Sequence, residues 1–153
     1  MCPEPEPGCS LGRSWFLLEN RRPDLGDEDR KRKRYVTVNE ADGSVSVAEK
    51  TGATNQRWNW LSCSGKNFLI NCATSLRLTY DGSSKVMASL AGSEWSYDSQ
   101  GFLREVSSGK VATVTKRYTH LKIAENIGYI KDDEGNLTDE PWSMFLWNII
   151  NVD

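Results

Sequence analysis

The sequence predicts an all-β domain built from three similar units, each made of four short strands. Short runs of alternating apolar and polar residues recur along the 153 residues, and this alternation is typical of half-buried strands. Glycine, asparagine, aspartate and serine separate the runs and indicate turns, and no run indicates a long helix. Three segments begin alike with Phe-Leu, at Phe16, Phe68 and Phe102, and a tryptophan follows each of them at a distance, which indicates a threefold internal repeat.

The first unit is expected over residues 14–61. It opens with Phe16 in FLLEN and closes at Trp58 in NQRW. Between them lies the alternating run RYVTVNEADGSVSVAEK, in which Asp42-Gly43 indicates a tight turn between two strands. The charged insert RRPDLGDEDRKRKR lengthens this unit relative to the second.

The second unit is expected over residues 65–98. A hairpin turn at Ser64-Gly65-Lys66 leads into it, and Phe68 in FLINC opens it. The run SLRLTYDGSSKVMASL supplies two strands around the turn signal Asp81-Gly82, and the unit closes at Trp95 in SEWSY.

The third unit is expected over residues 100–150. It opens with Phe102 in FLREV, continues through the alternating run KVATVTKRYTHLKIAE and closes at Trp142 in EPWSM. The insert GYIKDDEGNLTDEP lengthens this unit.

The three repeated tryptophans, Trp58, Trp95 and Trp142, are expected in the core. One four-strand unit leaves an apolar face exposed, whereas three units around an axis bury a shared core. A buried tryptophan fills a large volume, and its indole N–H then needs a hydrogen-bond partner. By alternation Trp60 lies on the same face as Trp58, with Tyr97 as its counterpart, so both are expected in the core or at its edge.

Length and charge indicate one soluble domain, with residues 1–13 as a flexible tail and residues 14–153 as the folded part. A chain of this size buries enough surface to fold without disulfides. The net charge of −2 argues against nucleic-acid binding through bulk positive charge. No apolar run reaches the roughly 20 residues that span a membrane, and the N-terminus MCPEPEPGCS lacks the features of a signal peptide.

Four cysteines, Cys2, Cys9, Cys63 and Cys72, are expected to be free or weakly paired thiols. A small Cys2–Cys9 loop or a structural disulfide framework is the alternative. The cysteines lack the spacing to each other and to histidine that zinc sites have, so we expect no metal and no cofactor.

The repeat pattern resembles the ricin B-type β-trefoil lectin domain over residues 14–150. Asn55–Trp58 (NQRW) reproduces that family's N-Q-x-W form, and the run WNWLSCSGKNFLI is similar to the cysteine-rich domain of the mannose-receptor family. The resemblance implies a β-trefoil of three four-stranded pseudo-repeats that recognises carbohydrate, including sulfated sugars, without catalysis.

The chain departs from that family where the sugar is held. The family carries an aspartate on a C-L-D-V-like strand, and here Thr37 or Arg77 stands in its place. The following runs, SVSVAEK and KVMASL, offer no aromatic side chain to stack on a sugar, and the third copy has LTDEP before its tryptophan. We therefore expect any sugar site to be rearranged.

Six polar and aromatic residues are candidates for carbohydrate binding, because a sugar needs both hydrogen bonds and an aromatic face. For Asn55 and Gln56 the alternative is that both side chains satisfy the backbone of a turn. For Tyr80 and Asp81, at the Asp-Gly turn, the alternative is plain turn chemistry. Tyr118 and His120 alternate with Lys122, so these three side chains are expected on one strand face. The candidates are Asn55, Gln56, Tyr80, Asp81, Tyr118 and His120.

The basic run of residues 30–34 follows the acidic stretch DLGDED, and we expect the two together to form a solvated loop of mixed charge. Its functional alternatives are a patch for an anionic partner, such as a sulfated glycan or a lipid headgroup, and a nuclear-localisation segment. Asn136 opens an N-glycosylation sequon that has meaning in the secretory pathway. The basic run consists of Arg30, Lys31, Arg32, Lys33 and Arg34.

These features favour a non-catalytic, lectin-like module that binds glycans in shallow loop pockets. The sequence has no G-x-S-x-G, H-E-x-x-H, P-loop, G-x-G-x-x-G or kinase motif. Its many loop carboxylates leave a two-carboxylate glycosidase site open by number, but nothing places two of them opposite each other. Single sugar sites are weak, so we expect several sites, a homo-oligomer or a place in a larger chain. The alternatives are a β-trefoil protein-interaction module with decayed sugar pockets and a heparin-type or anionic-lipid binder. We expect an extracellular or secreted protein, with a cytoplasmic one as the alternative.

Overall fold

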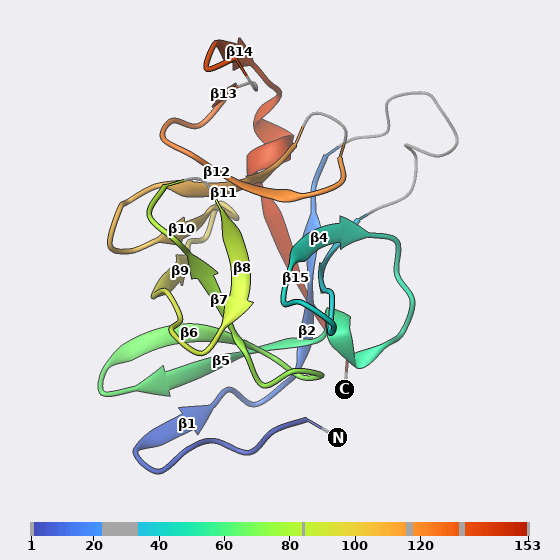
Figure 1. The fold of residues 1–153 in the computed structure, drawn as a ribbon, viewed down its shortest axis with the longest axis vertical. Coiled ribbons are helices and arrows are strands. Elements are labelled where there is room, and N and C mark those ends of the chain that lie inside the picture. Colours follow the sequence, from blue (N-terminus) through green and yellow to red (C-terminus); the bar gives the residue numbers. More distant parts are fainter. Residues whose placement is uncertain (1, 23–33, 84, 116–117, 132–133, 153) are drawn as a thin grey trace.

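Figure 1 shows a protein built of strands, in a computed structural model that describes residues 2–22, 34–83, 85–115, 118–131 and 134–152. The elements of the described residues are β-strands and two 3-10 helices, which confirms the all-β prediction. No helix in these ranges is long and apolar enough to cross a membrane. The elements are β1 (Cys9–Leu11), β2 (Phe16–Asn20), β3 (Tyr35–Val38), β4 (Val45–Ala48), η2 (Thr54–Gln56), β5 (Trp58–Cys63), β6 (Lys66–Asn71), β7 (Arg77–Tyr80), β8 (Val86–Ser89), β9 (Trp95–Tyr97), β10 (Leu103–Glu105), β11 (Val111–Val114), β12 (Leu121–Ala124), β13 (Tyr129–Lys131), β14 (Leu137–Asp139), η3 (Trp142–Phe145) and β15 (Trp147–Asn151).

Three antiparallel hairpins, β3–β4, β7–β8 and β11–β12, share one register. Two of the turns lie where the sequence predicts them, since Gly43 and Gly82 have φ of 78° and 90°. Glycine adopts this left-handed backbone without a Cβ clash. In each hairpin the second residue of the first strand lies opposite the third residue of the second strand: Val36–Val47, Leu78–Ala88 and Ala112–Ile123.

Three further pairs of strands contribute residues to the core. Antiparallel ladders join β5 to β6, β9 to β10 and β15 to β2. The β5–β6 hairpin turns at Ser64 and Gly65, as predicted, and both residues have positive φ. In each ladder a buried tryptophan lies opposite a buried polar residue: Trp58–Asn71, Trp95–Glu105 and Trp147–Asn20.

The third core tryptophan is Trp147, so the prediction for Trp142 is wrong, whereas those for Trp58 and Trp95 are confirmed. Trp142 lies in η3, is 60% exposed and touches the Phe102 ring edge-on with centroids 5.9 Å apart. The insert that forms β13 and β14 delays the closing strand, so β15 begins five residues later than expected. Each core indole Nε1 donates to a strand carbonyl: Trp58 to Val36 (3.0 Å), Trp95 to Leu78 (2.9 Å) and Trp147 to Ala112 (3.0 Å).

The N-terminal segment is bound to the fold through two disulfides, Cys2–Cys72 and Cys9–Cys63, which overturns the expectation of free thiols. Cys9 lies opposite Cys63 in the β1–β5 ladder, and this register brings the two sulfurs together. Figure 1 shows β1 running beside β5. Within the segment expected to be a flexible tail, Cys9–Leu11 is thus an edge strand, and both disulfides join the segment to the β5–β6 hairpin and the residue that follows it.

Candidate functional site

A pocket of about 350 Å³ lies where the second unit, the third unit and the β13–β14 insert meet. We call it the lysine pocket and define it by five of its lining residues: Tyr80, Lys110, Lys122, Tyr129 and Lys131. Tyr80 comes from β7, Lys122 from β12, and Tyr129 and Lys131 from β13. Lys110 immediately precedes β11. Residues distant in the sequence therefore converge on one hollow.

The β13–β14 hairpin presents Tyr129 and Lys131 on one face. Along β13 both residues are exposed, whereas Ile130 between them is buried in the core. Lys131 pairs with Leu137 across the ladder, so Leu137 lies on the same face and also lines the pocket. The Tyr129 side chain is 46% exposed, which leaves aromatic surface open to a ligand.

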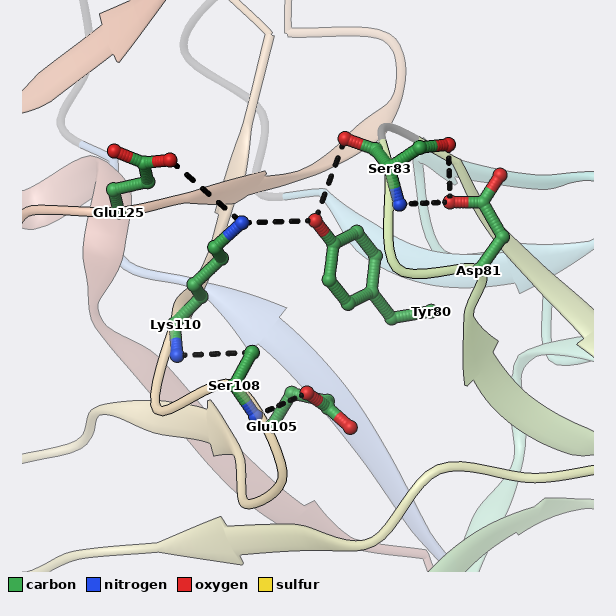
Figure 2. Close-up of polar contacts among 7 residues, drawn as sticks. All are labelled: Tyr80, Asp81, Ser83, Glu105, Ser108, Lys110 and Glu125. Atoms are coloured by element: carbon green, nitrogen blue, oxygen red, sulfur yellow. Dashed lines mark hydrogen bonds and ion pairs between the residues drawn. The ribbon is translucent and has the colours of Figure 1, made fainter.

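Lys110 is held beside Tyr80 by one hydrogen bond and by an ion pair with Glu125, both shown in Figure 2. Its Nζ donates to the Tyr80 Oη at 3.2 Å and forms an ion pair with Glu125 at 3.7 Å. The hydrogen bond with Tyr80 raises the pKa of Lys110 above the ordinary value of a lysine. The Tyr80 Oη in turn donates to the Ser83 carbonyl at 3.4 Å.

The turn before Lys110 is fixed by the buried carboxylate of Glu105. This carboxylate accepts the Ser108 backbone N–H at 2.8 Å, and Ser108 Oγ accepts the Lys110 backbone N–H at 3.2 Å (Figure 2). Asn71, at the corresponding position of the second unit, accepts backbone N–H groups of the following turn in the same way. A polar residue opposite each core tryptophan thus shapes the next turn.

Among the described lining residues of the pocket, cationic side chains outnumber carboxylates. Lys110, Lys122 and Lys131 bring three ammonium groups, and Glu125 is the one carboxylate among the described lining residues. Lys122 Nζ donates to the backbone carbonyl of Lys131, which ties β12 to the insert. The pocket can therefore donate several charged hydrogen bonds and offer an aromatic ring to the same ligand.

Of the predicted sugar-binding residues, Tyr80 lines this pocket and Asp81 lies beside it in the turn. The Asp81 Oδ1 accepts three hydrogen bonds, from Ser83 N at 2.8 Å, Ser83 Oγ at 3.0 Å and Lys85 N at 3.1 Å. Figure 2 shows the Ser83 contacts. This pattern is that of an Asx turn, which is the alternative that the Asp-Gly signal already allowed.

Asn55 and Gln56 lie away from the lysine pocket and hold their own loop. Gln56 is fully buried, and its Nε2 donates to the Glu49 carbonyl at 2.7 Å and to Thr37 Oγ1 at 3.1 Å. Asn55 Nδ2 donates to the Val38 carbonyl at 3.0 Å. Since the Gln56 amide is enclosed, its hydrogen bonds hold the loop that contains it.

Tyr118, His120 and Lys122 do not share a strand face as expected. Strand β12 begins at Leu121, and Tyr118 lies in the preceding turn with φ of 61°. Tyr118 is buried, whereas His120 is exposed and its Nδ1 lies 2.9 Å from Thr119 Oγ1. Of the three, Lys122 alone lines the pocket.

The basic run is described only at its last residue, because Arg30 to Lys33 lie outside the described ranges. The Arg34 guanidinium stacks over the Tyr118 ring at 5.6 Å from its centroid, and Arg22 lies over the same ring at 4.8 Å. Arg34 therefore packs onto an aromatic ring of the third unit.

The hydroxyl of Tyr35, which lies near the Tyr118 ring, is expected to lose its proton only at high pH. Burial and its hydrogen bond to Glu19 (2.8 Å) raise the pKa of Tyr35 to about 12. Because the pKa of Tyr35 in the folded protein lies above that of an exposed tyrosine, the neutral hydroxyl contributes its full stabilisation below about pH 10. This contribution is lost as the pH rises toward 12. Ultraviolet titration of phenolate should show a late component that Tyr35→Phe removes. If the titration curve of Tyr35→Phe keeps that component in full, the assignment to Tyr35 is wrong.

Sequence reasoning missed Lys110, Tyr129 and Lys131. The alternation of Tyr129, Ile130 and Lys131 is a strand signal that places an aromatic ring and a cation on one face. Within the described ranges, no three His, Cys, Asp or Glu side chains are close enough to hold a metal ion.

Comparison with known proteins relates the chain to a carbohydrate-active enzyme by fold. No family model and no curated protein matches its sequence. Among solved structures it is similar to the GlcNAcα1-4Gal-releasing endo-β-galactosidase from Clostridium perfringens, with a TM-score of 0.66 and 15% identity over 93% of this chain. The chain spans 34% of the length of that enzyme, about a third. At this identity the similarity establishes a shared fold alone.

Proposed function

We propose that the chain is a non-catalytic β-trefoil module of the ricin B type that binds glycans in the lysine pocket. The trefoil arrangement is supported by the common register of the three hairpins and by the equivalent hydrogen bonds of the three core tryptophans. The fold shared with part of a galactosidase agrees with a carbohydrate-related role.

One observation carries the glycan proposal: the pocket joins the exposed ring of Tyr129 to three lysine ammonium groups. A sugar ring has an apolar face that packs on an aromatic side chain and a rim of hydroxyl groups that accept hydrogen bonds. Tyr129 supplies the face, and Lys110, Lys122 and Lys131 supply the donors. In this proposal the rearranged sugar site is formed by β12, by β13 and by Lys110, which precedes β11.

The charge of the pocket favours an anionic glycan, carrying a sulfate or a carboxylate. Three lysines against Glu125 attract a negative substituent, and Glu125 itself is already paired with Lys110. A millimolar dissociation constant corresponds to about −4 kcal/mol, and each charge-assisted hydrogen bond adds roughly 1.5–3 kcal/mol. Charge-assisted hydrogen bonds to an anionic substituent would therefore bring the dissociation constant well below the millimolar range. Several sites or oligomerisation would raise the affinity further.

A binding role without chemistry is supported by the make-up of the pocket. Glycoside hydrolysis uses two carboxyl groups on opposite sides of the scissile bond. Among the described lining residues Glu125 has no carboxyl partner across the pocket, and the Lys110 ammonium holds it in an ion pair.

An extracellular or secreted setting is supported by the two disulfides, Cys2–Cys72 and Cys9–Cys63. Disulfides form and persist in oxidising compartments and are rare in reducing ones. The sequon at Asn136 lies in the exposed β13–β14 turn beside the pocket, which agrees with that setting.

A second candidate function is a protein-interaction module, favoured by the apolar surface of the insert. Leu137 and Trp142 are 61% and 60% exposed, and Tyr129 lies on the same segment of chain. Large apolar side chains gathered on a surface often mark a protein interface.

A glycan array at low and physiological salt, including sulfated, sialylated and neutral structures, tests the proposal. We expect saturable binding to anionic glycans that persists at physiological salt. Lys131→Glu should weaken this binding tenfold or more, about 1.4 kcal/mol, while its exposure keeps the change in stability within roughly 0.5 kcal/mol. Surface plasmon resonance with the array hit measures the loss.

Lys50→Glu is the matched control, because Lys50 is exposed and does not line the pocket. Equal weakening by Lys50→Glu and Lys131→Glu would show that net charge, and not the pocket, governs binding. A blank array with folded protein would reject the glycan proposal and favour the protein-interaction module.

A further inference from the structure

A second hollow of about 370 Å³ lies on strands β5, β6 and β9, apart from the lysine pocket. We call it the Trp60 groove; it is lined by Trp60, Asn67, Trp95, Ser96 and Tyr97. The two sites have no lining residue in common. The groove therefore can take a ligand of its own.

Fixed aromatic rings form the walls of the groove. Trp60 packs on Phe16 with ring centroids 6.2 Å apart and stays partly exposed. The Tyr97 hydroxyl donates to the Trp147 carbonyl at 2.7 Å, which holds the ring against the core. Trp95 is buried beneath, with its indole bonded to the Leu78 carbonyl. These rings are preorganised, so a ligand would bind without ordering them.

Three polar groups on the groove have no hydrogen-bond partner among the described residues: the Trp60 indole N–H, the Asn67 amide and the Ser96 hydroxyl. Together they offer three donor groups and two acceptor oxygens beside aromatic surface. No charged side chain belongs to the described lining, in contrast to the lysine pocket.

We propose that the Trp60 groove is a second binding site, and that it takes a neutral saccharide. An aromatic wall packs on the apolar face of a sugar ring, and the indole, amide and hydroxyl groups match its hydroxyl groups. A sulfate or carboxylate finds no counter-charge there, so the groove discriminates against the anionic ligands that suit the lysine pocket. One chain then engages a neutral and an anionic sugar unit at once, which strengthens attachment to a glycan surface.

Nuclear magnetic resonance of the ¹⁵N-labelled full chain tests this with lactose, N-acetyllactosamine and cellobiose at millimolar concentrations. We expect at least one sugar to shift the Trp60 indole N–H signal saturably, while the backbone signals of Lys122 and Tyr129 stay in place. The signal is assigned with Trp60→Phe. The shift should be independent of salt, because no charge is involved.

Asn67→Ala should weaken the titration severalfold, and Ser96→Ala gives a second variant at an exposed position. Asn126→Ala is the matched control, since it makes the same change in the lining of the lysine pocket. A Trp60 signal unmoved by all three sugars, or shifts confined to the lysine pocket, would overturn the proposal. A blank result for anionic glycans would reject the proposed function and leave this titration unaffected.

Discussion

Trp147→Ala is expected to lower the free energy of unfolding by about 3–5 kcal/mol, whereas Trp142→Ala lowers it by about 1 kcal/mol. Trp147 is fully buried, so its removal leaves a large cavity in the core. It also leaves the Ala112 carbonyl without the indole donor that lies 3.0 Å away. The Trp142→Ala substitution removes one edge contact with the Phe102 ring and exposes little new surface.

Urea unfolding followed by circular dichroism measures both variants. Trp147→Phe separates the two causes, because it keeps an aromatic ring in the core and removes the hydrogen bond to Ala112. We expect a loss of roughly 1–3 kcal/mol for it, the range for a buried acceptor left unsatisfied. Trp58→Ala is the positive control from the first unit. If Trp142→Ala destabilises as strongly as Trp147→Ala, the third unit closes at Trp142 after all.

The hairpins could be predicted from the sequence because their two strands are neighbours in the chain. Alternation and the Asp-Gly signals predict the β3–β4 and β7–β8 hairpins from neighbouring residues, without knowledge of the rest of the fold. The closing tryptophan of the third unit is different, since its position depends on the length of the insert. Both Trp142 and Trp147 follow that insert, and local sequence does not decide which one reaches the core.

The opening landmark of the first unit is also shifted by one residue. The polar partners of the core tryptophans are Asn71 and Glu105, each three residues after Phe68 and Phe102. In the first unit the partner is Asn20, and Leu17 stands three residues before it, not Phe16. Sequence similarity aligned the two phenylalanines, whereas strand register follows the buried polar residue.

The candidate site could be predicted only in part, because it is assembled by the fold. Tyr80 was recognisable as an aromatic residue next to a turn, but its neighbours Lys110 and Lys131 come from other elements. The family motif directed attention to Gln56, and the structure encloses that side chain.

The two disulfides were missed because their pairing depends on β1, a strand of three residues with no alternation to reveal it. Removing one of them is expected to cost about 3 kcal/mol and removing both about 7 kcal/mol, by the chain-entropy relation. The first loss is the smaller because the disulfides are nested. With Cys9–Cys63 intact, Cys2–Cys72 closes only the short ring formed by residues 2–9 and 63–72.

The second loss opens a long loop, 54 residues for Cys9–Cys63 or 70 for Cys2–Cys72, and a longer loop restrains the unfolded chain more. The test compares Cys2→Ala/Cys72→Ala, Cys9→Ser/Cys63→Ser and the quadruple variant in urea. Alanine is used in the first because Cys72 is buried. We expect the quadruple variant to lose more than twice what either pair loses. Strictly additive, small losses would mean that β1 is held by its ladder with β5, with the covalent bonds contributing little to the unfolding free energy.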